Sequence, residues 1–267
     1  MSLDFEGAAY TRASTLQRQW GLDLLDESNL RGDEVILDLG CGDGALTARW
    51  ADRVPNGRVV GVDRSPGMLH YATGAYSRPN VEYRLDDIED LRLEPGTYDL
   101  IISNAALHWV QGHETLLPKL HEMLRPGGRI RLSFGAAGNC HTFFTVVRDA
   151  MQLPSFTNSF EDFRWPWRNE TVDEYRQMLA QTFFADVQVW GQIADASFPC
   201  SQAIVAWMEQ PLLVPFLAHL PLSLRSSFHD IVVDNMLAMS RQSDRTYFEY
   251  FRKINVQAWR DYRASLL

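Results

Sequence analysis

Short apolar runs alternate with amphipathic stretches along the first half of the chain. Helical patterns cover residues 45–54, begin again at Pro66 and recur over 114–128, where an apolar stripe ends at Pro126 and Gly127. Apolar runs between and beside them predict strands, and strands alternating with helices indicate βαβ units around a parallel sheet. The predicted strands are 34–39, 58–63, 81–85, 98–103 and 129–134.

The pattern changes after Phe134. Later segments are predicted to be mainly helical and are rich in aromatic side chains, while 185–193 and 247–259 alternate as strands do. We expect one domain over residues 1–267, in which a helical cap lies across an edge of the sheet. The predicted core is 30–135, 185–198 and 245–262, and the predicted cap is 8–28, 136–184 and 199–244.

Composition is that of a globular protein, with 46% hydrophobic and 22% charged residues. The formal charge of −9 disfavours a nucleic-acid partner, because phosphate contacts need clustered Lys and Arg. Cys41, Cys140 and Cys200 lack metal-ligand or disulfide spacing, so no metal is expected. Without a signal-peptide pattern or a membrane-spanning run, we expect a cytoplasmic monomer or homodimer with no membrane partner.

The stretch 38–46, DLGCGDGAL, carries the candidate chemistry. Its glycines fit a dinucleotide fingerprint, and Asp63 lies downstream where it would bind ribose hydroxyls. Two acids count against a dinucleotide, since Asp43 would repel a pyrophosphate and Asp38 ends the strand where an apolar residue is usual. The glycines are Gly40, Gly42 and Gly44.

S-adenosylmethionine (SAM) accommodates both acids, because it has no phosphate and carries an ammonium and a sulfonium. Asp38 is expected to hold the ammonium, and the N-terminus of the next helix to face the methionine carboxylate. Taken singly, Asp63 could be a helix cap and Asp87 a solvated turn residue. The predicted cofactor-binding residues are Asp38, Gly40, Gly42, Gly44, Asp63, Arg64, Met68, Asp87, Ile88 and Asn104.

Four stretches together resemble the class I SAM-dependent methyltransferases: VILDLGCGDGALT, VVGVDRSPGMLHYA, YDLIISNAALHWV and LRPGGRIRLSF. The stretches 10–17, 104–109 and 201–220 are similar to trans-aconitate 2-methyltransferases and juvenile hormone acid methyltransferases. The resemblance implies an α/β fold, with a Rossmann-like, seven-stranded, mostly parallel sheet and helices on both faces. It also implies methylation of a small-molecule carboxylate, with S-adenosylhomocysteine as the second product.

The resemblance further implies that residues 103–109 line the methyl-transfer site. Gln17 and Trp109 match positions that contact the acid in the insect carboxyl methyltransferases, and His108 matches their LHW, where the aconitate enzymes tend to have Gln. A carboxylate is ionised at neutral pH, so it needs donors to orient it for in-line displacement and no general base. The candidate catalytic residues are His108, Trp109 and Gln17.

Other functions remain open at this point. With a hydroxyl, amine or carbon-acid acceptor, His108 would be the general base. An NAD-dependent oxidoreductase and a non-catalytic SAM binder are further alternatives, and His108 and Trp109 could be packing residues. Arg164 and Arg168 are either solvated or a clamp for a second acceptor carboxylate.

Overall fold

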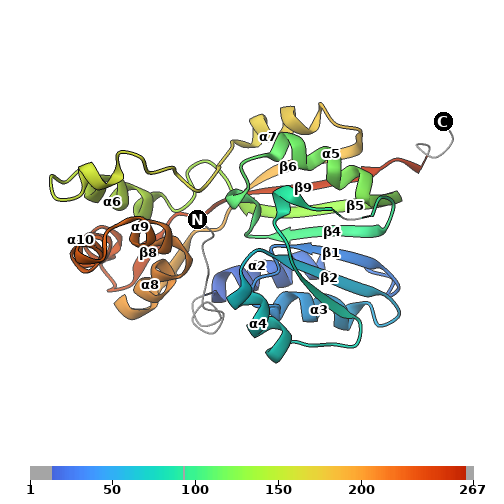
Figure 1. Ribbon diagram of the computed structural model, residues 1–267, viewed down its shortest axis with the longest axis horizontal. Coiled ribbons are helices and arrows are strands. Elements are labelled where there is room, and N and C mark those ends of the chain that lie inside the picture. Colours follow the sequence, from blue (N-terminus) through green and yellow to red (C-terminus); the bar gives the residue numbers. More distant parts are fainter. Residues whose placement is uncertain (1–13, 93, 263–267) are drawn as a thin grey trace. The chain divides into compact units, whose positions relative to one another are not determined.

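The structure is a computed structural model that describes residues 14–92 and 94–262. The chain forms two compact units, whose helices and strands are labelled in Figure 1. The first unit comprises Met1–Ala137, Trp167–Gln192 and Lys253–Leu267, and the second comprises Gly138–Pro166 and Ile193–Arg252. Among the described helices, none is long and apolar enough to cross a membrane.

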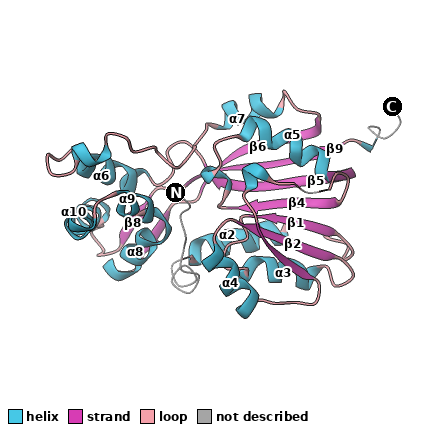
Figure 2. Ribbon diagram, in the orientation of Figure 1, coloured by secondary structure: helices cyan, strands magenta, loops and turns pink. Residues whose placement is uncertain are grey.

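A seven-stranded sheet of order β3-β2-β1-β4-β5-β9-β6 forms the first unit (Figure 2). The first five strands pair in parallel, and β9 is antiparallel to β5. The predicted Rossmann-like, mostly parallel sheet is thus confirmed. The strands are β1 (Val35–Leu39), β2 (Arg58–Asp63), β3 (Val81–Leu85), β4 (Tyr98–Asn104), β5 (Leu124–Gly135), β6 (Phe184–Ile193) and β9 (Arg252–Arg260).

Helices cover both faces of this sheet because its side chains alternate between two apolar layers. On β1, Ile36 packs with Leu24 and Trp50 of α2 and α3, whereas Leu37 packs with Leu116 and Tyr175 of α5 and α7. The helices are α2 (Thr15–Asp26), α3 (Ala45–Arg53), α4 (Pro66–Ala75), α5 (His113–Met123) and α7 (Val172–Leu179), with short 3-10 turns η1 (Ile88–Asp90) and η2 (Leu107–Trp109).

The order of the strands creates a switch point. From β1 the chain proceeds to β2 and β3 on one side, and then crosses to β4 on the other side of β1. In open parallel sheets ligands bind in the crevice outside the carboxyl ends of the strands at such a point. The glycine turn after β1 and the segment after β4 both lie there.

The second unit is mainly helical, with its own aromatic core. Phe156 and Phe228 are fully buried and their rings lie 5.1 Å apart, edge to face. The aromatic residues predicted for a cap supply this core. The elements are α6 (His141–Met151), η3 (Thr157–Phe160), β7 (Ala196–Phe198), α8 (Ser201–Trp207), a π-helical turn η4 (Met208–Leu212), α9 (Val214–His219), α10 (Leu222–Ser240) and β8 (Tyr247–Glu249).

Two predicted boundaries were wrong. The stretch 247–259 is not one strand: β8 pairs with β7 in a separate two-stranded sheet, and β9 joins the large sheet. The break follows Glu249, whose carboxylate accepts from two backbone N–H groups at the start of α6. The helix predicted over 114–128 ends at Met123, because β5 already begins at Leu124 and pairs there with β4.

Two segments predicted for the cap belong to the first unit. Helix α2 packs Leu24 and Leu25 into the layer below β1, and α7 packs Tyr175 and Leu179 into the opposite layer. Conversely, residues 193–198, predicted for the core, belong to the second unit. The part of the predicted cap at 8–13 lies outside the described residues.

Candidate functional site

The glycine turn connects β1 to α3 through left-handed backbone conformations. Its φ angles are +74° at Gly40, +54° at Gly42 and +80° at Gly44, which glycine adopts without strain. The Gly40 N–H donates to the carbonyl of Val62 at 2.8 Å, which holds the turn against the end of β2. A Cβ on Gly40 would lie 2.2 Å from the Cβ of Ala106, so the turn also packs closely on the segment after β4.

Asp63, the last residue of β2, is bonded to the same turn. Its Oδ2 accepts from the Gly42 N–H at 2.9 Å, and its Oδ1 accepts from the Ser65 N–H at 2.9 Å. Burial raises the pKa of Asp63. Each carboxylate oxygen has a further acceptor site, so the predicted contact with ribose hydroxyls is compatible with these bonds.

Asp38 lies under the turn with 5% of its surface exposed. Its Oδ2 accepts from the Thr47 hydroxyl on α3 at 2.7 Å. Burial, together with the charge of Asp63, raises the pKa of Asp38 to about 7. Asp38 therefore ties the strand to α3 and changes protonation near neutral pH.

Asp43 is paired, which the sequence pattern did not indicate. Its Oδ2 lies 2.9 Å from Nη2 of Arg18 on α2, and its Oδ1 accepts from the Ala45 N–H at 3.1 Å. The repulsion of a pyrophosphate expected from Asp43 is therefore partly neutralised. The first amide of α3, expected to face the methionine carboxylate, is occupied by Asp43. Arg18, beside the predicted Gln17, was missed and places a guanidinium at the turn.

A cavity of about 40 Å³ lies against the turn. Asn104 donates from Nδ2 to the Gln17 carbonyl at 2.8 Å, which joins the end of β4 to α2. Within the described residues, Oε1 of Gln17 and Oδ1 of Asn104 are buried and have no hydrogen-bond partner. Buried acceptors beside a guanidinium suit a ligand carrying both an ammonium and a carboxylate. The lining residues are Ser14, Gln17, Arg18, Gly40, Cys41, Gly42, Asp43, Leu46 and Asn104.

The predicted cofactor-binding residues Met68, Asp87 and Ile88 lie in the segments that follow β2 and β3. Met68 is buried in α4, and Ile88 is half-buried with its Cδ1 3.8 Å from where a Cβ on Gly40 would lie. Asp87 caps η1, because its Oδ1 accepts from the backbone N–H of Glu89 at 3.1 Å. Arg64 acts electrostatically on the adjacent Asp63. An apolar edge and acceptor oxygens are thus available beside β2 and β3.

His108 lies in η2, directly after β4. The Gly135 N–H donates to its Nδ1 at 3.3 Å, which assigns the proton of the neutral ring to Nε2. Burial and the neighbouring His113 lower the pKa of His108 to about 4. The ring is therefore neutral at physiological pH and is a weak base, which argues against the general-base alternative.

Trp109 packs against a tryptophan from a distant part of the chain. The rings of Trp109 and Trp167 have centroids 4.8 Å apart, with planes inclined by 50°. The backbone N–H of Arg168 donates to the backbone carbonyl of His108 at 2.8 Å, which fixes the segment of Trp167 beside η2. Trp167 was predicted as part of the cap core, and its place beside Trp109 was missed.

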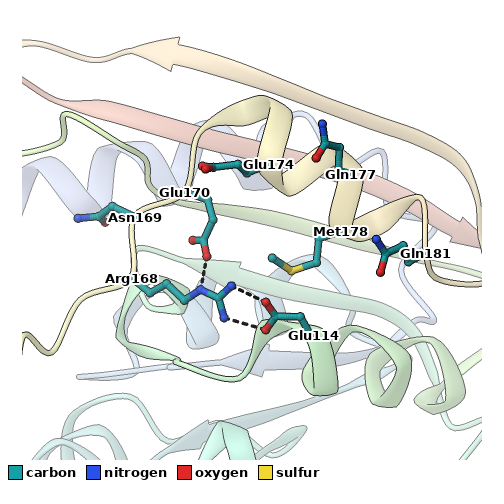
Figure 3. A pocket seen from close by; sticks show the side chains of 8 residues that line it. All are labelled: Glu114, Arg168, Asn169, Glu170, Glu174, Gln177, Met178 and Gln181. Atoms are coloured by element: carbon teal, nitrogen blue, oxygen red, sulfur yellow. Dashed lines mark hydrogen bonds and ion pairs between the residues drawn. The ribbon is translucent and has the colours of Figure 1, made fainter.

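A second cavity, of about 490 Å³, lies along α7 (Figure 3). The Arg168 guanidinium is not open to a ligand carboxylate, because it binds both oxygens of Glu114, at 2.7 and 2.5 Å, and also Glu170. The lining holds three carboxylates, those of Glu114, Glu170 and Glu174, and only one guanidinium, so this cavity is unsuited to an acid. Among the described residues, no group of three side chains is placed to hold a metal ion. The lining residues are Glu114, Arg168, Asn169, Glu170, Glu174, Gln177, Met178 and Gln181.

Residues 36–128 match the family described as "Methyltransferase domain". A trans-aconitate 2-methyltransferase of Deinococcus radiodurans is 30% identical over 224 residues, covering 83% of this chain and 85% of that protein. A malonyl-[acyl-carrier protein] O-methyltransferase of Acetivibrio thermocellus is 38% identical over 126 residues, covering 47% and 44%.

A solved structure shares the fold. It is the phosphoethanolamine N-methyltransferase 2 of Haemonchus contortus in complex with SAM, which aligns with a TM-score of 0.59 at 16% identity, covering 96% of this chain and 57% of that chain. The likeness to the Deinococcus enzyme extends over most of both sequences, and the NAD-dependent alternative is set aside. The chain therefore belongs to the class I SAM-dependent methyltransferases, enzymes that use SAM as their methyl donor.

Proposed function

We propose that this enzyme transfers the methyl group to a carboxylate oxygen of a small-molecule acid, giving a methyl ester and S-adenosylhomocysteine. The observation that carries the proposal is the state of His108, a neutral ring with Nδ1 occupied and a proton on Nε2. Such a ring orients an acceptor by donating and is a poor proton acceptor. A carboxylate is already ionised and needs only this kind of help. The names of the relatives agree, since both refer to methylation of carboxylic acids or their derivatives.

The residues around the glycine turn fit the cofactor. Oε1 of Gln17 and Oδ1 of Asn104, buried and without partners among the described residues, would accept from its ammonium, and Arg18 would bind its carboxylate. Asp63 would accept from the ribose hydroxyls. When bound, the cofactor supplies an electrophilic methyl group on a sulfonium.

The chain's contribution to the reaction is orientation. Holding the acceptor oxygen in line with the methyl carbon and sulfur is worth roughly 7–11 kcal/mol of the barrier. Nε2–H of His108 and the indole N–H of Trp109 would position the acceptor, and Trp167 fixes the Trp109 ring. Gln17 would accept from the cofactor through Oε1 and donate to the acceptor through Nε2, which reconciles its predicted role with its place in the small cavity.

An activity screen with methyl-labelled SAM tests the proposal. Trans-aconitate, shorter dicarboxylic acids, fatty and isoprenoid acids and phenols would be offered to the purified protein. We expect labelled product from an acid, and we expect mild alkali to release the label as methanol, because the bond formed is an ester. Label that survives alkali, or product formed only from phenols or amines, would overturn the carboxyl assignment.

A further inference from the structure

Lys253 is a largely buried lysine whose amine has no counter-ion among the described residues. Only 5% of its surface is exposed, and its Nζ lies 4.6 Å from the centre of the Trp20 ring on α2. Within the described part of the chain, Nζ makes no hydrogen bond and no ion pair. A buried charge that lacks a partner is strongly unfavourable, and the ring face compensates only in part. No described residue forms an ion pair with this amine, which is therefore available to an anionic ligand.

Lys253 is connected to the proposed acceptor site through its backbone pairing and through Trp20. Lys253 is the cross-strand partner of Gly135, whose N–H donates to Nδ1 of His108. Paired strands are about 4.8 Å apart, so Lys253 lies one strand beyond the residue that fixes the imidazole. Trp20 follows Gln17 by three positions on α2, which puts both side chains on one face of that helix. Lys253 thus adjoins the strand that bonds His108 and the helix that carries Gln17.

The polar groups near Lys253 do not neutralise its amine. Ser133 is on the same face of the sheet, two residues from Gly135, and its buried Oγ has no hydrogen-bond partner among the described residues. The charged groups acting on Lys253 are Arg131, Asp23 and Glu27. Both acids are exposed, and Glu27 pairs with Arg131 at 2.6 Å. Burial and the charge of Arg131 lower the pKa of Lys253 to about 8, so the amine is largely protonated at neutral pH.

We propose that Lys253 binds an anionic group of the acceptor other than the oxygen that is methylated. An ion pair with the reacting oxygen would withdraw charge from the nucleophile, so a second carboxylate is the suitable partner. The inference rests on the proposed function and extends it, because it makes the preferred acceptor a diacid or a polyacid. Lys253 thereby becomes a residue that determines specificity.

The test compares Lys253→Met and Lys253→Arg with the wild-type enzyme, using trans-aconitate and a monocarboxylic acid as acceptors. For Lys253→Met we expect KM for trans-aconitate to rise at least about tenfold, as for loss of one charge-assisted bond. The kcat, the KM for the monoacid and the affinity for S-adenosylhomocysteine should change less than about twofold, and Lys253→Arg should restore most of the loss. Lys119→Met, which removes an amine bonded to a backbone carbonyl of η1, is the matched control.

Two further measurements keep the test decisive. Wild-type KM for trans-aconitate should rise between about pH 7 and about pH 9 as the amine loses its proton, and this rise should be absent in Lys253→Met. With S-adenosylhomocysteine present, citrate should raise the Tm of the wild type and not that of Lys253→Met. Equal loss toward the monoacid, weaker cofactor binding or no Tm shift in the wild type would overturn the inference. Failure of the proposed function is recognised separately, by label that resists alkali.

Discussion

The backbone N–H of Gly135 and Nδ1 of His108 lie 3.3 Å apart, across the junction between the last parallel strand and the turn after β4. This bond keeps the imidazole in one tautomer and directs its only proton to Nε2. Strand β5, which pairs with Lys253 of β9, thus sets the tautomer of His108.

This tautomer predicts a modest role for His108. His108→Ala should lower kcat about tenfold, because one neutral hydrogen bond is lost, whereas loss of a general base costs roughly 10²–10⁴-fold. His108→Gln keeps a donor near the Nε2 position and should recover much of the rate. The wild-type kcat should not vary between about pH 6 and about pH 9 through this ring, since its folded pKa of about 4 lies below that range. A sigmoidal rise with an apparent pKa of 6 to 7 that disappears in His108→Gln would contradict this assignment.

The raised pKa of Asp38 predicts that protons are released when the cofactor binds. With a pKa of about 7, its carboxyl is about half protonated at pH 7, and an approaching cation lowers that pKa. Calorimetry in buffers of different ionisation enthalpy should therefore detect release of up to about half a proton per site near pH 7 and almost none near pH 9. Asp38→Asn should abolish the release. Equal heats in all buffers at pH 7 would show that Asp38 does not respond to the ligand charge.

The close packing of Gly40 on Ala106 predicts that the turn does not tolerate a side chain at position 40. Gly40→Ala places a Cβ 2.2 Å from the Ala106 Cβ at φ +74°, so we expect a loss of about 1–3 kcal/mol in the free energy of unfolding and a loss of cofactor binding. Gly74→Ala is the control, since no atom lies within 4 Å of the position that its new methyl group would take on α4, and it should be neutral or stabilising by up to about 1 kcal/mol. Urea unfolding and calorimetry with S-adenosylhomocysteine measure both effects. The prediction fails if the two variants behave alike.

The position of Arg18 in the lining of the small cavity predicts that this residue contributes to cofactor affinity. Arg18→Met removes the guanidinium from the small cavity and breaks its ion pair with Asp43, so the Kd for S-adenosylhomocysteine should rise at least about tenfold. Arg53→Met breaks an exposed pair with Asp26 and should leave that Kd unchanged, with an effect on stability below about 1 kcal/mol. Similar Kd values for both variants would remove Arg18 from the site.

The sequence by itself determined the parallel sheet, the glycine turn and the segment after β4. These features are local: a period of two or of 3.6 residues reports which side of an element is buried, and closely spaced glycines fix a turn over a few positions. Gly40, Gly42 and Asp63 therefore meet as expected, because consecutive parallel strands bring their carboxyl ends to one edge.

Only the tertiary structure decided which distant residues lie together at the candidate site. The pairing of Arg18 with Asp43, the packing of Trp167 on Trp109 and the position of Lys253 against Trp20 each join segments whose separation in sequence carries no periodic signal. Alternation also indicates that a residue is buried without indicating what covers it. For that reason 247–259 had the pattern of a single strand although β8 and β9 belong to different sheets, and Lys253 within it is largely buried against Trp20 instead of lying in solvent.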